Sequence, residues 1–178
     1  MKGEYRSLWQ PTFYAPQLIE VTSDFFIKQG ITTLCCDLDN TLAPYDELKP
    51  RRTILNWIEK MKKAGLIFLI ISNNDEERVK PFADAVGVDY LAKTGKPFQN
   101  KLLMFLAKKG YAKEKVIVIG DQLLTDVWLA NRLGMKSMFV EKLVPYDHWP
   151  TKPNRLIESC LKRRYRRQHR FHHWRDQG

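Results

Sequence analysis

Residues 31–41 have the sequence Ile-Thr-Thr-Leu-Cys-Cys-Asp-Leu-Asp-Asn-Thr, an apolar run that ends in two carboxylates one residue apart. The run from Ile31 to Cys36 predicts a strand that is buried on both faces. Since residues i and i+2 of an extended chain point the same way, Asp37 and Asp39 are expected to share one side of the strand's carboxyl end. Two carboxylates this close repel each other unless a cation or a proton lies between them. Mg²⁺ prefers such hard oxygen ligands, and open α/β sheets bind their ligands at this edge.

Further apolar runs follow this strand and alternate with amphipathic segments. The alternation predicts βαβ units, a parallel sheet and right-handed crossovers. We therefore expect an α/β fold, a Rossmann-like three-layer sandwich with a five-stranded parallel sheet. The expected strands are 31–36, 66–71, 88–92, 116–119 and 137–140, and the expected helices are 18–29, 51–64, 75–86, 97–109 and 126–133.

Composition divides the chain into three parts. Residues 1–16 are expected to form an irregular arm, residues 17–150 a single catalytic domain, and residues 151–178 a basic C-terminal helix and tail. A chain of 178 residues that is 44% hydrophobic and 28% charged fits one soluble globular domain with a sizeable core.

The net charge of +10 indicates anionic partners, which include nucleic acid, an anionic lipid surface and a phosphorylated substrate. No apolar run approaches the roughly 20 residues that span a bilayer, and residues 1–9 lack the apolar region of a signal peptide. The three cysteines, Cys35, Cys36 and Cys160, are odd in number and have no CxxC spacing. A reduced, cytoplasmic setting is the simplest interpretation.

Polar residues follow four of the predicted strands, and their order along the chain resembles the four motifs of the haloacid dehalogenase (HAD) superfamily of phosphatases. Four motifs in order, each after a strand or at a helix start, carry far more weight than one. The resemblance covers residues 31–140 and implies a phosphoric monoester hydrolase that depends on Mg²⁺ and passes through an aspartyl-phosphate. The motif residues are Asp37 and Asp39, then Ser72 and Asn73, then Lys96, and last Asp121 and Asp126.

The resemblance assigns a role to each residue of the first motif. Asp37 is the expected nucleophile, because covalent catalysis divides one hard displacement into two easier ones. Asp39 is expected to protonate the leaving oxygen and then to take a proton from water. The backbone amides of Leu38 and Asn40 are expected to hold the phosphoryl group, and Thr41 is expected to support the turn.

In the second and third motifs the residues alone leave alternatives open. Ser72 and Asn73 suit a phosphate oxygen, but either could merely cap a helix or shape a turn. Lys96 is expected to neutralise charge on the nucleophile and the phosphoryl group, since its Lys-Pro step resembles the third motif. Lys93 is the rival, and we expect it to be a solvated loop charge.

The expected metal ligands are the carboxylates of Asp37 and Asp121 and the carbonyl oxygen of Asp39. An Asp and water site without His or Cys favours Mg²⁺ over zinc. Asp126 has three interpretations: it supports Lys96, it reaches the metal through water, or it is a favourable acid in the first turn of a helix.

The spacing of the motifs leaves no room for a sizeable cap domain, because residues 42–71 and 74–96 are used up by the predicted elements. An open site admits a large substrate, such as a protein, a nucleic-acid end or a lipid headgroup. The DLDNT and GDQLLTD strings resemble the YqeG-type group of HAD subfamily IIIA, which is related to phosphatidylglycerophosphate phosphatases. That resemblance implies a lipid phosphate monoester. The alternatives are a phosphoprotein, a sugar phosphate or a nucleotide, and, in another class, an RNA- or ribosome-binding protein with a secondary phosphatase site.

The C-terminal tail interleaves basic and aromatic residues. This pattern suits an anionic lipid surface, which predicts peripheral membrane contact, and less strongly RNA; a solvated, partly disordered end is the plainest alternative. We expect a helical stripe before the tail to pack on the domain and to present the basic face. The stripe is formed by Leu156, Ile157, Cys160, Leu161 and Tyr165.

Overall fold

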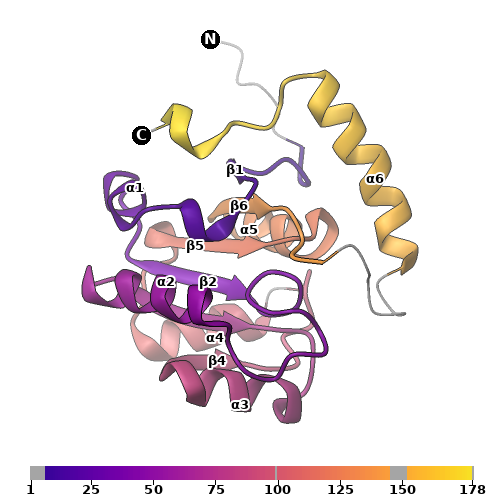
Figure 1. The fold of residues 1–178 in the computed structure, drawn as a ribbon. Helices are drawn as coiled ribbons and strands as arrows, with labels where there is room; N and C mark the ends of the chain where they lie inside the picture. Colours follow the sequence, from indigo (N-terminus) through magenta and orange to yellow (C-terminus); the bar gives the residue numbers. More distant parts are fainter. Residues whose placement is uncertain (1–6, 99, 145–151, 178) are drawn as a thin grey trace.

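The computed structural model of the protein describes residues 7–98, 100–144 and 152–177. Its centre is a six-stranded, all-parallel sheet with the strand order β1-β6-β5-β2-β3-β4 (Figure 1). The α/β class and the parallel sheet agree with the prediction. The strands are β1 (Phe13–Ala15), β2 (Thr33–Asp37), β3 (Ile67–Ile71), β4 (Asp89–Leu91), β5 (Val116–Gly120) and β6 (Lys136–Val140).

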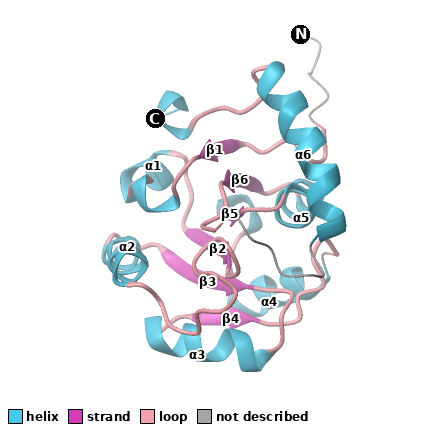
Figure 2. Cartoon of the chain, turned by 45° about the vertical axis from the view of Figure 1, so that its right-hand side comes forward, coloured by secondary structure: helices cyan, strands magenta, loops and turns pink. Residues whose placement is uncertain are grey.

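Helices cover both faces of the sheet, which completes the expected three layers (Figure 2). Alternate residues of the central strands enter two separate apolar clusters, as strands buried on both faces require. One cluster takes its helical residues from α1, α2 and α3, and the other from α4 and α5. The helices are α1 (Ser23–Lys28), α2 (Arg52–Lys63), α3 (Glu76–Val86), α4 (Asn100–Lys109), α5 (Trp128–Leu133) and α6 (Lys152–Arg167).

The sixth strand, β1, lies in the segment that was expected to be an irregular arm. Phe13 lies opposite Met138 of β6, and the side chains of Phe13 and Ala15 are buried. The C-terminal tail covers the outer edge of this strand, since the backbone amide of Tyr14 donates to the carbonyl of His172 at 2.8 Å. The tail after α6 is thus ordered against the domain, at least up to Gln177.

α6 packs on the domain with a face that differs from the expected stripe. Leu161 and Tyr165 join an apolar cluster with Phe139 of β6, as predicted. Ile157 is 56% exposed and Cys160 is also exposed, so these two were wrongly placed on the packed face, while the side chain of Leu156 lies outside the described residues. The inward position is taken by Glu158, whose Oε1 accepts the backbone amide of Leu124 at 3.0 Å.

The described chain between β2 and Lys96 holds one loop, α2, β3, α3 and β4, and no inserted domain. The expected absence of a cap therefore agrees with the structure over this stretch. Among the described residues, no helix is both long enough and apolar enough to cross a membrane.

Candidate active site

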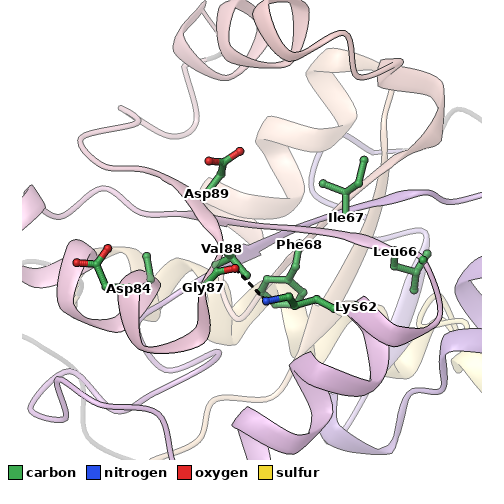
Figure 3. Close-up of a pocket in the computed structure, with 10 residues that line it drawn as sticks. Lys62, Leu66, Ile67, Phe68, Asp84, Gly87, Val88 and Asp89 are labelled. Carbon is green, nitrogen blue, oxygen red and sulfur yellow. Dashed lines mark hydrogen bonds between the residues drawn. The ribbon is translucent and has the colours of Figure 1, made fainter.

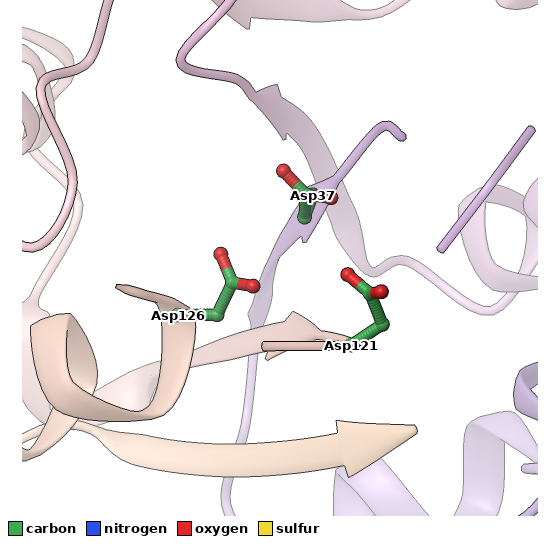
Figure 4. A group of neighbouring side chains, drawn as sticks. All are labelled: Asp37, Asp121 and Asp126. Carbon is green, nitrogen blue, oxygen red and sulfur yellow. The ribbon is translucent and has the colours of Figure 1, made fainter. Parts of the chain in front are cut away.

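The predicted site residues gather at the carboxyl ends of the central strands. Asp37 is the last residue of β2, Ser72 follows β3, and Asp121 follows β5. β2 lies between β3 and β5 in the sheet, so these three strands end side by side. Figure 4 shows the carboxylates of Asp37, Asp121 and Asp126 turned toward a common space. One oxygen of each lies within 4.8 Å of the others, and all three residues are buried.

Lys96 reaches into this cluster from the loop after β4. Its Nζ donates to Oδ1 of Asp37 at 2.5 Å and to Oδ1 of Asp126 at 2.7 Å, and the residue is 6% exposed. Asp126 therefore contacts Lys96, as the first of its three interpretations predicts. Lys93 is exposed, as expected of a solvated loop charge.

The cluster carries an excess of negative charge. Three buried carboxylates face one ammonium group, which leaves a formal charge of −2 when all are ionised. Burial is the largest of the causes that raise the pKa of Asp37 well above its ordinary value; Lys96 acts to lower it, and the carboxylates of Asp126, Asp121 and Asp39 act to raise it. Burial lowers the pKa of Lys96, but Asp126 and Asp37 outweigh this and raise it overall. Oδ2 of Asp37 is buried and accepts no hydrogen bond from the described residues.

These features fit a divalent cation. Carboxylate oxygens are the ligands that Mg²⁺ prefers, and a charge of +2 balances the excess. An orphaned, buried carboxylate oxygen on Asp37 beside Asp121 is costly unless a cation or proton satisfies it. Asp37 and Asp121 would hold the ion. Oδ1 of Asp126 instead accepts a hydrogen bond from Nζ of Lys96.

Gly120 allows Asp126 to approach the sheet. A Cβ atom at position 120 would lie 2.3 Å from Cγ of Asp126, closer than any side chain permits. The expected helix at 126–133 begins earlier, with the π-helical turn Leu123–Val127, and the amide of Gln122 donates to Oδ2 of Asp126 at 3.2 Å. Such turns widen a helix and are frequent at functional sites.

Two residues that the sequence analysis did not single out hold Asp39. Nδ2 of Asn74 donates to its Oδ2 at 2.6 Å, and Arg78 of α3 forms an ion pair with its Oδ1 at 2.8 Å. Arg78 is 7% exposed and also donates to the carbonyl of Pro44. These contacts fix the orientation of the Asp39 carboxylate in this structure.

The turn after β2 is tight. Asn40 has a left-handed backbone (φ 62°), which asparagine tolerates better than most residues. Its amide donates to the carbonyl of Ala43 at 2.8 Å, so in this structure that amide serves the turn instead of facing a ligand. The predicted contact between the Asn40 amide and a phosphoryl group would require this bond to open, whereas the Leu38 assignment stays a prediction. Thr41 is buried in the same turn.

The second-motif residues behave differently from each other. Oγ of Ser72 accepts the amide of Asn74 at 3.1 Å, which is the turn-shaping role that the sequence left open. The carboxamide of Asn73 forms two hydrogen bonds with the backbone of Lys96. Its Oδ1 accepts the Lys96 amide at 2.7 Å, and its Nδ2 donates to the Lys96 carbonyl. Asn73 thus positions the backbone of Lys96.

The cavity drawn in Figure 3, of about 710 Å³, lies at the opposite edge of the sheet. It is lined by residues before and at the start of β3 and β4, among them Lys62, Ile67 and Gly87. Nζ of Lys62 donates hydrogen bonds to the carbonyls of Val86 and Gly87 and so caps the C-terminus of α3. No carboxylate of the Asp37 cluster lines this cavity.

Comparison with known proteins places this geometry in a family context. The model of the family described as mitochondrial PGP phosphatase matches residues 4–144. A probable phosphatase, YqeG of Bacillus subtilis, is 32% identical over 163 residues, which cover 89% of this chain and 95% of that protein. The mitochondrial phosphatidylglycerophosphatase GEP4 of Saccharomyces cerevisiae is 28% identical over 151 residues, with 76% of this chain and 82% of that protein covered.

Solved structures share the fold at lower identity. An uncharacterised protein from Listeria monocytogenes superposes with a TM-score of 0.53 at 19% identity, covering 67% of this chain and 88% of the other. The cobalt-bound deoxy-D-mannose-octulosonate 8-phosphate phosphatase of Haemophilus influenzae gives a TM-score of 0.51 at 15% identity, covering 63% and 69%. These likenesses support the three-layer α/β architecture.

Proposed function

This chain belongs to the mitochondrial PGP phosphatase family and is a phosphatase of the HAD type; from that premise we propose that it hydrolyses phosphate monoesters through Asp37 with the help of Mg²⁺. The observation that carries the proposal is the buried carboxylate of Asp37, which has one oxygen on Lys96 and the other orphaned beside Asp121. A bound Mg²⁺ would supply positive charge for the phosphoryl oxygens.

In the proposed mechanism Asp37 is the nucleophile and Asp39 is the general acid and base. A carboxylate oxygen of Asp37 forms a bond to phosphorus while the ester P–O bond breaks, and Asp39 transfers a proton to the departing oxygen. Water then attacks the aspartyl-phosphate, Asp39 takes the water proton, and phosphate leaves Asp37 free. A monoester that binds as its monoanion carries the proton that Asp39 passes to the departing oxygen in the first step. Lys96 balances charge at Asp37 throughout, and the amide of Leu38 is a candidate for holding a phosphoryl oxygen.

We propose phosphatidylglycerophosphate as the substrate. The family description and the relation to GEP4 support this choice, and a bulky substrate suits a site with no inserted domain between β2 and Lys96. Phosphate release from an aryl phosphate, with Mg²⁺ and with a chelator, tests the chemistry: we expect turnover that needs the metal. A panel of esters then tests the substrate, and preference for sugar phosphates, nucleotides or phosphopeptides over phosphatidylglycerophosphate would contradict the lipid assignment.

Replacing Asp39 by asparagine is expected to slow hydrolysis according to the leaving group. An asparagine keeps the shape and a hydrogen-bond acceptor for Arg78 but cannot transfer a proton. General acid catalysis is worth about 10²- to 10⁴-fold, and the loss should be largest for an alkyl phosphate, whose leaving oxygen needs the proton most. The rates of alkyl and nitrophenyl esters measured with wild type and Asp39→Asn provide the check. An equal loss for both esters would show that Asp39 does not act as the acid.

A further inference from the structure

Four aliphatic side chains are exposed on one half of the edge that carries the site. Their exposed fractions are 41% for Ile19, 53% for Leu48, 41% for Leu143 and 56% for Ile157. Ile19 follows β1, Leu48 belongs to the loop after β2, and Leu143 follows β6, so these three leave carboxyl ends of strands. Figure 1 shows β2 and β5 pointing toward this side, with the loop after β2 extending beyond them.

A cavity and shared contacts connect these residues to the catalytic turn. Ile19, Leu143 and Arg51 line a cavity of about 390 Å³, and Arg51 also lines the neighbouring hollow with Leu48. The amide of Leu143 donates to the carbonyl of Asn40 at 3.0 Å. Ile157 precedes Glu158, which holds the amide of Leu124 three residues after Asp121.

The cavity also contains a polar group that lacks a partner. Thr41, four residues after Asp37, lines it; the residue is 1% exposed and its Oγ1 makes no hydrogen bond to the described residues. Buried hydroxyls are normally satisfied, so this one indicates a ligand or water in the cavity. Leu18 and Ile54 add apolar surface to the wall, and Gln17, Thr53, Glu141 and Lys142 add polar surface.

The charges around these side chains are predominantly basic. Carboxylates near them are paired: Glu47 with Arg51, Glu141 with Arg166, and Glu20 with Arg175. The one acidic residue of α6, Glu158, is buried. Of the exposed carboxylates of this edge, Asp46 lines the same hollow as Leu48, and Asp75, Glu76 and Glu77 lie at the start of α3, where they bound the surface on the side of β3. The basic residues beside the aliphatic ones are Lys49, Arg51, Arg52 and Lys142.

We propose that Ile19, Leu48, Leu143 and Ile157, with Lys49, Arg51, Arg52 and Lys142, form a docking face that binds an anionic lipid bilayer. The cavity at its centre takes the part of a phospholipid headgroup next to the scissile phosphate. The inference rests on the proposed function for the orientation of the substrate, while docking itself needs no turnover. Aliphatic side chains insert between lipids, and Lys and Arg gain from anionic headgroups. RNA binding favours exposed aromatic rings for stacking, and all four side chains are aliphatic.

Vesicle flotation tests the docking face directly. We expect the wild-type chain to float with vesicles that contain phosphatidylglycerol. Its partition onto vesicles of phosphatidylcholine alone should be lower by about tenfold or more. The double variant Leu48→Ser/Ile157→Ser removes two aliphatic side chains. Its partition onto anionic vesicles should fall by about tenfold or more, because the partial burial of these two side chains in the bilayer stabilises the bound protein by a free energy of that size. The matched control is Ile27→Ser/Met104→Ser, whose side chains are 50% and 73% exposed on α1 and α4. It should float like wild type.

The outcomes separate docking from catalysis. Absence of flotation with anionic vesicles would overturn the proposal, as would equal flotation of the Leu48→Ser/Ile157→Ser variant and wild type. RNA binding at low salt without vesicle binding would also overturn it. Aryl phosphate hydrolysis and thermal unfolding are measured in parallel, and both should be the same in all variants. Failure of hydrolysis in every protein would count against the proposed function while leaving the flotation result valid.

Discussion

Replacing Asp37 by asparagine is expected to reduce phosphate release by about 10⁴-fold or more, because the variant lacks the group that attacks phosphorus. An amide oxygen is a poor nucleophile and a weaker metal ligand than a carboxylate. Steady-state hydrolysis of an aryl phosphate in excess Mg²⁺ gives the first measurement. Acid quenching with labelled substrate gives the second: wild type should retain a phosphoryl group that hydroxylamine removes, and Asp37→Asn should retain none.

The fold should survive this substitution. Asparagine has nearly the shape of aspartate, and Lys96 keeps its ion pair with Asp126 at 2.7 Å. Removing one of three crowded carboxylates also relieves repulsion, since burial and its acidic neighbours already raise the pKa of Asp37. A matched control is Asp84→Asn, which breaks an exposed pair with Lys80 and should leave activity unchanged. Turnover of Asp37→Asn close to that of the control would remove Asp37 from the role of nucleophile.

The central strands and the acidic cluster were predictable because their signals are local. Each central strand is a short, mostly apolar run, and Asp37 and Asp121 lie at or just after the ends of theirs, so parallel pairing brings them together. β1 gave no such signal. It has three residues, and it becomes a strand because β6, more than 100 residues away, provides its partner.

The contacts of polar side chains were less predictable for a different reason. Arg78 lies on α3 at a position that the sequence alone would assign to solvent, and it is buried because the loop after β2 folds over it and offers Asp39 and Pro44. The packed face of α6 depended on helical phase: Glu158 turns inward to satisfy Leu124, which rotates Ile157 outward. Asp126 had three interpretations that no local pattern could separate, and its contact with Lys96 follows from the π-helical turn before α5.

Replacing Lys96 by methionine should impair both stability and activity. Methionine fills similar volume but leaves the carboxylates of Asp37, Asp121 and Asp126 without their ammonium partner. Removing one member of a buried ion pair typically lowers the free energy of unfolding by about 3–5 kcal/mol. Loss of charge compensation at the phosphoryl group should reduce turnover by about 10²- to 10³-fold. Lys93→Met, an exposed lysine three residues earlier, is the control and should change neither property by much.

The pH dependence identifies the cause of the instability. In wild type the raised pKa of Lys96 keeps it charged, so its contribution is constant from acidic to mildly alkaline pH. In Lys96→Met the carboxyl of Asp37, whose pKa is already raised, loses the ammonium charge that acts to lower it, so the variant should lose stability as pH rises and regain it as pH falls and Asp37 takes up a proton. Mg²⁺ should restore part of the loss at high pH, because a divalent cation replaces the missing positive charge. Denaturant unfolding at two pH values, with and without Mg²⁺, measures both effects. A deficit that is independent of pH and of metal would mean that lost packing, and not charge, explains the role of Lys96.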